Sequence, residues 1–131
     1  MASALYSFGK GSIAKAEIVL ASDDIRILLV DSTYTFDDTD QYVSDITAGA
    51  EVARSSALAN QTISTTGVFD ADDKVITAVT GDTVANAILY KYNASDASAR
   101  LLSFHEGVDV VPNGQDITVV WSSGASKIFK L

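Results

Sequence analysis

The 131-residue chain carries 17 acidic and nine basic side chains, and its formal net charge of −8 argues against a nucleic-acid partner, because an acidic surface repels phosphate backbones. Residues 1–131 are 47% hydrophobic but have no apolar run of the roughly 18 residues that span a membrane, so they are predicted to form one domain with a real core and no membrane partner. The lack of cysteine excludes disulfides and cysteine-based zinc sites, and a histidine-dependent site would have to use His105.

The first segment, residues 4–18, permits two interpretations. Its spacing places Leu5, Phe8 and Ile13 on one side of a short helix, although two glycines weaken that helix. Alternatively, residues 1–12 are an extended arm that becomes ordered against a neighbouring molecule. The segment contains no charged region followed by a long apolar stretch, so we expect no signal peptide and synthesis in the cytoplasm.

Strand-like segments and turns occupy the rest of the chain. Residues 23–32 form a nearly continuous apolar run, which predicts a strand buried on both faces. Asp40 is predicted to cap a single helical turn carrying Tyr42, Val43 and Ile46. Further short strands are expected at residues 47–58, 60–69, 74–79, 83–93, 100–106, 116–122 and 127–131. This pattern predicts an all-β fold, a single antiparallel β-sandwich or jelly-roll-like domain with at most a short N-terminal helical segment.

The most enzyme-like stretch is VFDADDKV, residues 68–75. Asp70 and Asp72 stand at the alternate positions that begin a calcium loop. However, valine occupies its sixth position in place of glycine, and glycine its twelfth in place of glutamate. A phosphatase with this motif needs an α/β fold that the chain lacks. We therefore interpret the cluster as a polar corner between two strands, in which Asp70 or Asp73 accepts a hydrogen bond from a backbone N–H.

The other candidates for chemistry also have simpler structural interpretations. The acidic run at residues 36–40 is expected to combine a helix cap with solvent-facing charge. His105 is predicted to be a surface or strand-end histidine, since no serine stands on a glycine-flanked turn of the type that hydrolases use. We therefore expect no enzyme activity, no cofactor and no metal site. Five aromatic residues on strand-like segments are expected to be core, or alternatively a platform for a partner or a sugar: Tyr90, Tyr92, Phe104, Trp121 and Phe129.

Nearly the whole chain resembles a group of small virion proteins of tailed bacteriophages. The segments that carry this resemblance, in order, are ALYSFGKGSIAKAEI, DDIRILLVDSTYTF, YVSDI, GVFDADD, AVTGDTVANAILYK and PNGQDITVVWSSGASKIFKL. These segments are structural motifs and contain no catalytic residues. The resemblance implies a virion structural component, most like a head decoration or cement protein that binds the outside of the major capsid protein lattice and stabilises the head.

This resemblance also sets expectations for partners and location. The implied partners are the major capsid protein and further copies of the chain, as a dimer or, less favoured, a trimer. The implied location is the exterior of the capsid. The predicted interface consists of apolar residues near the two ends: Leu5, Tyr6, Phe8, Ile128, Phe129 and Leu131. One alternative is a tail, baseplate or fibre-associated virion protein, and an alternative of another class is a carbohydrate-binding module.

Overall fold

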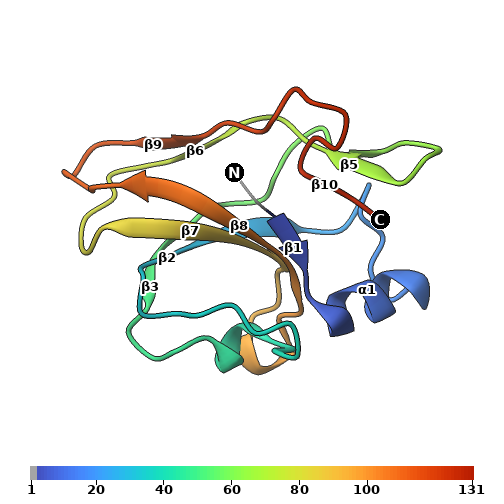
Figure 1. Cartoon of the computed structure of the whole chain (residues 1–131), viewed down its shortest axis with the longest axis horizontal. Coiled ribbons are helices and arrows are strands. Elements are labelled where there is room, and N and C mark those ends of the chain that lie inside the picture. Colours follow the sequence, from blue (N-terminus) through green and yellow to red (C-terminus); the bar gives the residue numbers. More distant parts are fainter. Residues whose placement is uncertain (1–2) are drawn as a thin grey trace.

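The computed structural model describes residues 3–131 and contains a five-stranded antiparallel sheet that is covered on both faces (Figure 1). The elements in chain order are β1 (Ser3–Leu5), α1 (Ser7–Ala14), β2 (Ile25–Val30), η1 (Val43–Asp45), β3 (Glu51–Arg54), β4 (Thr62–Ile63), β5 (Val68–Asp70), β6 (Lys74–Ile76), β7 (Val84–Lys91), η2 (Asp96–Ser98), β8 (Leu101–Val110), β9 (Ile117–Val119) and β10 (Phe129–Lys130). The large sheet has the strand order β1-β8-β7-β2-β3, and two smaller sheets have the orders β10-β5-β4 and β6-β9. All named pairings are antiparallel. The predicted all-β, sandwich-like fold with a short N-terminal helix is confirmed.

The middle strands β2 and β7 are apolar on both faces because both faces of the large sheet are covered. Ile27 pairs with Leu89, and Leu28 pairs with Ile88. All four side chains are fully buried. Neighbouring residues of a strand point to opposite faces, so Ile27 and Leu89 belong to one core while Leu28 and Ile88 belong to the other. The prediction of a doubly buried strand at residues 23–32 is confirmed.

The first core lies between the large sheet and a layer built from the two smaller sheets (Figure 1). In this layer β5 and β6 follow one another closely, and they pair with β10 and β9 respectively. Residues 122–127 form the loop that separates the two pairings. Phe69 and Phe129 stack with their ring centroids 5.1 Å apart. The buried side chains that this layer contributes include Phe69, Ile76, Ile117, Val119, Trp121, Ile128 and Phe129.

The second core lies on the opposite face of the large sheet, under residues 31–50. Tyr34, Val43 and Ala50 from this segment are buried there. The predicted helical turn exists as η1, but its cap differs from the prediction. Asp45 accepts hydrogen bonds from the backbone N–H groups of residues 41 and 42, at 2.9 and 3.0 Å. Asp40 instead accepts a hydrogen bond from the Tyr34 hydroxyl at 2.8 Å, because the folded loop brings that hydroxyl to it.

The strand predicted at residues 60–69 is a hairpin, formed by β4 and β5. The backbone N–H of Gly67 donates to the carbonyl of Ser64 at 3.0 Å, which closes the turn. Gly67 has a φ of +84°, a conformation in which a residue with a Cβ is strained. The prediction of one continuous strand was therefore wrong, because the alternation of threonine and serine gave no sign of the turn that reverses the chain.

Residues 3–12 belong to the domain, and this corrects the expectation of an extended arm for that part of residues 1–12. β1 pairs with β8, and the N–H of Tyr6 donates to the carbonyl of Leu102 at 3.0 Å. Helix α1 packs against the same strand so closely that a Cβ on Gly9 would collide with the carbonyl oxygen of Leu101. Met1 and Ala2 lie outside the described residues. Within residues 3–131, no helix is long and apolar enough to cross a membrane.

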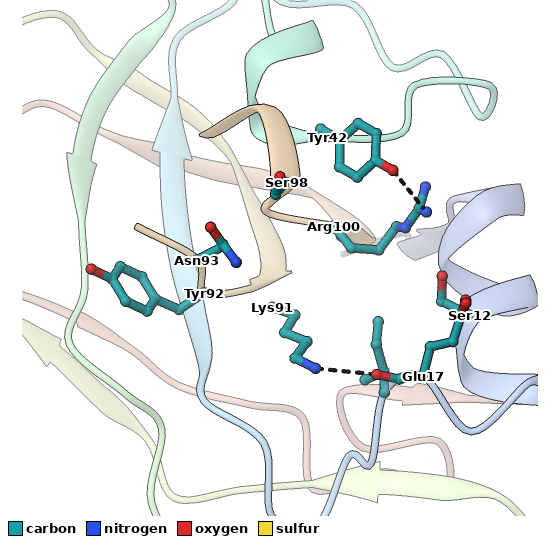
Figure 2. Close-up of a pocket in the computed structure, with 9 residues that line it drawn as sticks. Ser12, Glu17, Tyr42, Lys91, Tyr92, Asn93, Ser98 and Arg100 are labelled. Atoms are coloured by element: carbon teal, nitrogen blue, oxygen red, sulfur yellow. Dashed lines mark hydrogen bonds between the residues drawn. The ribbon is translucent and has the colours of Figure 1, made fainter. Parts of the chain in front are cut away.

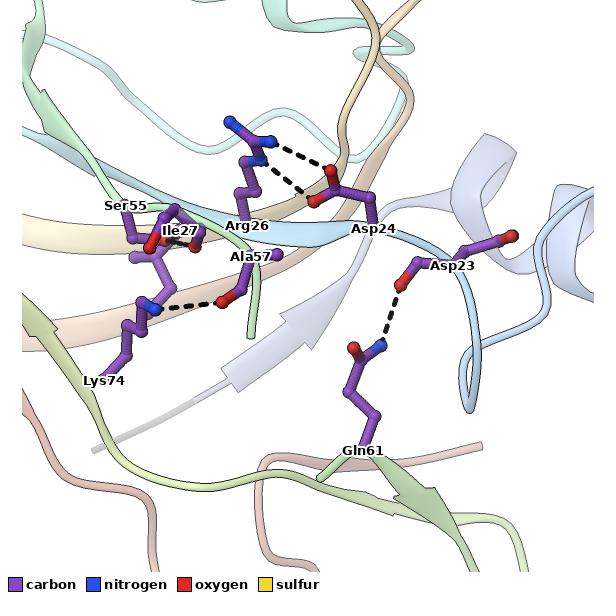
Figure 3. A network of polar contacts seen from close by, with 9 residues as sticks. Asp23, Asp24, Arg26, Ile27, Ser55, Ala57, Gln61 and Lys74 are labelled. Carbon is purple, nitrogen blue, oxygen red and sulfur yellow. Dashed lines mark hydrogen bonds and ion pairs between the residues drawn. The ribbon is translucent and has the colours of Figure 1, made fainter. Parts of the chain in front are cut away.

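Polar side chains fasten residues 55–61 to the rest of the domain (Figure 3). Ser55 Oγ accepts a hydrogen bond from the N–H of Ile27 at 2.8 Å. Gln61 Nε2 donates to the carbonyls of Leu20 and Asp23, at 2.6 and 3.0 Å. These contacts continue the edge of the large sheet beyond β3 without regular strand pairing, so the polar groups concerned have structural roles.

Candidate functional site

The candidate site is a pocket of about 230 Å³ at one end of the large sheet (Figure 2). Three stretches that are distant in sequence meet there, namely α1, the segment before η1, and the connection between β7 and β8. The lining residues are Ser12, Glu17, Ile18, Tyr42, Lys91, Tyr92, Asn93, Ser98 and Arg100. The pocket brings together two cations in an otherwise acidic protein.

Arg100 holds its guanidinium at the edge of this pocket through neutral partners. Nη2 donates to the Tyr42 hydroxyl at 3.1 Å, and Nη1 reaches Gln41 Oε1 at 3.5 Å. The guanidinium carbon lies 4.4 Å from the centroid of the Tyr42 ring and 6.0 Å from that of Phe8. Cation–π contacts of this kind orient a guanidinium without neutralising it.

The other two arginines are paired with carboxylates. Arg26 forms a bidentate pair with Asp24 at 2.9 Å, and Arg54 binds Asp96 at 2.8 Å while also contacting Glu51. Among the described residues, no carboxylate lies within ion-pair distance of Arg100. Arg100 is therefore the arginine whose positive charge the fold leaves uncompensated.

Lys91 and Ser12 complete the polar wall of the pocket. Lys91 Nζ donates to the backbone carbonyl of Glu17 at 3.1 Å and lies 3.3 Å from the Asp23 carboxylate, so its charge is balanced. Ser12 is only 4% exposed and lines the pocket. Figure 2 shows Ser12 on the same side of the pocket as Arg100.

The aspartates of residues 68–75 form the predicted polar corner. Asp73 Oδ1 accepts a hydrogen bond from the backbone N–H of Trp121 at 2.9 Å. The indole N–H of Trp121 donates to the backbone carbonyl of Asp72 at 3.1 Å, and the Asp72 carboxylate accepts from Asn60 at 2.6 Å. These bonds join the two small sheets where the loop at residues 122–127 separates them. The described residues contain no group of three or more side chains placed to hold a metal ion.

The second acidic run, residues 36–40, is used locally. Asp37 accepts hydrogen bonds from the hydroxyl and the backbone N–H of Thr39, at 2.6 and 2.9 Å, and these bonds lower the pKa of its carboxyl. Asp38 accepts from the hydroxyl of Ser7 at 3.2 Å. Burial raises the pKa of Asp40 above its usual range. The expected helix cap is absent from this run, and its carboxylates bind loop and helix-start groups instead.

His105 is buried, which corrects the prediction of a surface or strand-end histidine. It is 2% exposed on β8, and its Nε2 lies 2.9 Å from Ser103 Oγ. Its ring centroid is 5.8 Å from that of Trp121. Burial lowers the pKa of His105 to about 4, because the charged imidazolium would lose its hydration. The chain covers this strand position with residues 3–5 and 121, which the local sequence could not reveal.

The structure assigns most of the five aromatic candidates to the core. Tyr90, Phe104, Trp121 and Phe129 are each at most 7% exposed. Tyr92 is 39% exposed, and its ring is covered by the Arg26 guanidinium carbon at 3.7 Å. The core interpretation is therefore confirmed for four of them.

The six predicted interface residues do not form one surface. Tyr6, Ile128 and Phe129 are buried in the domain, which corrects their assignment to an interface, and Leu5 is half-buried. Phe8 and Leu131 are 45% and 50% exposed. Their exposure differs because Tyr6 belongs to the second core and Ile128 and Phe129 belong to the first. Phe8 instead lies on helix α1, and Leu131 follows the end of β10.

Sequence reasoning missed the Arg100 site, and the local sequence pointed away from it. Asp96 is the last carboxylate before Arg100 in the sequence, four residues away. In the structure Asp96 binds Arg54 instead. Comparison with known protein families and with curated proteins produced no match for this chain.

Proposed function

We propose that the protein is a structural component of a tailed-bacteriophage particle, a decoration protein that binds the outside of the major capsid protein lattice and stabilises the head. The resemblance noted in the sequence supports this proposal. The observation that carries it in the structure is an apolar outer face on the β6–β9 ribbon. Val75 on β6 is 47% exposed, and Val120, the residue after β9, is 63% exposed.

These two valines point outward from the same ribbon. Val75 pairs with Thr118 across the ribbon, and the neighbouring Ile76 and Val119 are buried. Because side chains alternate along a strand, Val75 and Val120 lie on the face turned away from the core. A cement protein needs such a face to bury against the shell, and burial of apolar surface is the main source of affinity in protein association. The acidic remainder of the surface would keep the protein off the packaged DNA.

The first experiment measures copy number in purified particles. Quantitative mass spectrometry is expected to find the chain at a number close to that of the major capsid protein. A dozen or fewer copies would favour the alternative, a tail, baseplate or fibre-associated protein. Absence from particles would refute a virion role altogether.

The second experiment tests the contact face. Val75→Asp should weaken binding to shells stripped of the protein, because it places a charge in an apolar contact. Val19→Asp is the matched control, since Val19 is 50% exposed on a different part of the surface. Equal binding by the two variants would rule out the β6–β9 face. On the shell we expect a symmetric oligomer, a dimer before a trimer.

A carbohydrate-binding module remains the second candidate, and one groove favours it. The half-buried ring of Phe36 lies beside Asn86, Glu106 and Asp109, and it stacks on the buried ring of Phe104 at 5.1 Å. Amide and carboxylate groups next to aromatic rings suit sugar hydroxyls and sugar faces. Binding to a glycan array that Asn86→Ala and Glu106→Ala abolish would replace the decoration proposal with this one.

A further inference from the structure

Arg100 presents a positive charge that the domain does not neutralise, at the edge of a pocket of side-chain size. We propose that this pocket binds a carboxylate, and that the carboxylate comes from an aspartate or glutamate side chain of a protein partner. The choice of partner rests on the proposed function, in which that partner is the major capsid protein. The carboxylate chemistry rests on the pocket alone.

The guanidinium is already oriented for such a ligand. Its contacts with Tyr42 and Gln41 occupy part of its five N–H donors. The remaining donors can bind both oxygens of one carboxylate, which is the geometry that arginine prefers. Ser12 lines the pocket on the same side, so its hydroxyl can supply one more donor (Figure 2). A guanidinium held in advance loses less entropy when it binds.

Charge selects a monoanion over a polyanion. The chain has a net charge of −8, and Glu17 lines the same pocket as Arg100. Lys91 is already balanced by Asp23. Arg100 therefore offers one positive charge, and the Glu17 carboxylate already in the pocket disfavours any ligand with more than one negative charge.

The surroundings of Arg100 favour a macromolecular source of the carboxylate. The exposed ring of Phe8 and the ring of Tyr42 flank the guanidinium. Arginine and aromatic side chains dominate the energetic centres of protein interfaces, where a partner surface excludes water from the ion pair. A free small acid would leave the ring of Phe8 uncovered.

The first arm of the test uses the isolated protein and needs no partner. Sodium acetate replaces sodium chloride at constant ionic strength while ¹H–¹⁵N NMR spectra are recorded. Saturable shifts confined to Ser12, Asn93 and the Arg100 side chain are expected. Arg100→Gln should weaken acetate binding about tenfold to a hundredfold. Lys10→Gln removes the same charge from the same helix as Ser12, outside the pocket, and should leave binding unchanged.

Three results of this arm would overturn the carboxylate site. They are the absence of saturable shifts, equal effects of the Arg100 and Lys10 variants, and tighter binding of inorganic phosphate than of acetate. Arg100→Lys keeps the charge but loses the two-pronged geometry, so intermediate binding is expected. Thermal melting of each variant establishes that it is folded before it is titrated.

The second arm measures sedimentation of the chain with shells stripped of it. Arg100→Gln should bind at least tenfold more weakly than Lys10→Gln. If both variants bind shells like the wild type, the carboxylate is not on the shell, and a site that binds acetate would serve a free acid. If the wild type itself does not bind shells, the proposed function fails, while the acetate arm still decides whether the Arg100 site exists.

Discussion

Replacing Tyr6 tests whether the N-terminal residues are part of the folded domain or an arm attached to it. Tyr6 is fully buried, and its ring meets that of Phe36 edge-on with centroids 4.9 Å apart. Its hydroxyl is 2.9 Å from that of Tyr34, which in turn donates to Asp40. Burial raises the pKa of Tyr6 above its usual range, so the hydroxyl stays protonated at ordinary pH.

Two substitutions divide the contribution of Tyr6 into its parts. Tyr6→Ala removes a buried aromatic ring, which lowers the free energy of unfolding by about 3–5 kcal/mol in typical cores. Tyr6→Phe removes only the hydroxyl contact, which is expected to cost about 1 kcal/mol. Domains of this size are stable by roughly 5–15 kcal/mol, so Tyr6→Ala should bring the protein close to unfolding at raised temperature.

Urea denaturation at 25 °C, followed by tryptophan fluorescence, measures these differences. Phe8→Ala is the matched control, because Phe8 is 45% exposed and its removal should change stability by less than about 0.5 kcal/mol. The arm interpretation predicts equal, negligible effects of Tyr6→Ala and Phe8→Ala. It also predicts that a chain lacking residues 1–8 stays folded. Either result would refute the reasoning from burial.

Three further predictions concern the helix, the buried histidine and the acidic corner. Gly9→Ala should lower the free energy of unfolding, measured in urea, by about 1–3 kcal/mol, because the new Cβ meets the backbone of β8. Gly11 has open space around it, so Gly11→Ala should raise the free energy of unfolding by about 0.5–1 kcal/mol. The pKa of His105 is about 4 in the folded protein against 6.5 when unfolded, so neutral His105 contributes fully to the free energy of unfolding above pH 6.5. That free energy should fall by at most about 3 kcal/mol between pH 6.5 and 4, and His105 should cause no further change below pH 4. NMR titration of His105 and urea denaturation across this range should agree, and His105→Gln should flatten the dependence of stability on pH. Asp73→Ala should lower the free energy of unfolding by about 1–2 kcal/mol because it removes the acceptor of the Trp121 backbone N–H, while Asp70→Ala should lower it by less than about 0.5 kcal/mol. A rise in the melting temperature at micromolar calcium would show instead that this acidic corner binds a metal ion.

Several features followed from local sequence patterns and were confirmed by the structure. The apolar run at residues 23–32 predicted a doubly buried strand, and β2 is one. The turn-rich stretches set apart short strands. A backbone N–H does bind Asp73 as predicted, but it belongs to Trp121, 48 residues away, so the local sequence did not identify the partner. The confirmed strand and turns depend on the spacing of apolar and turn-forming residues along the chain.

The errors arose where the environment of a residue is set by distant segments. Nothing near His105 in the sequence indicates that β1 and Trp121 cover it. Tyr6 and Phe129 stand near the termini and were predicted to be exposed, yet the Tyr6 N–H bonds Leu102 of β8 and Phe129 pairs with Phe69 of β5. Burial depends on which segments pack above a side chain, and that is a property of the assembled layers.

The charge of Arg100 shows the same division most clearly. The sequence determined an acidic β-rich chain with few cations, and it placed Asp96 four residues before Arg100. The tertiary structure decided that Asp96 binds Arg54 on β3. Two parallel hydrogen bonds of 2.8 Å join the Asp96 carboxylate to the Arg54 guanidinium, which is the geometry that this pair prefers. Because Asp96 is paired with Arg54, 42 residues away in the sequence, no carboxylate among the described residues pairs with Arg100.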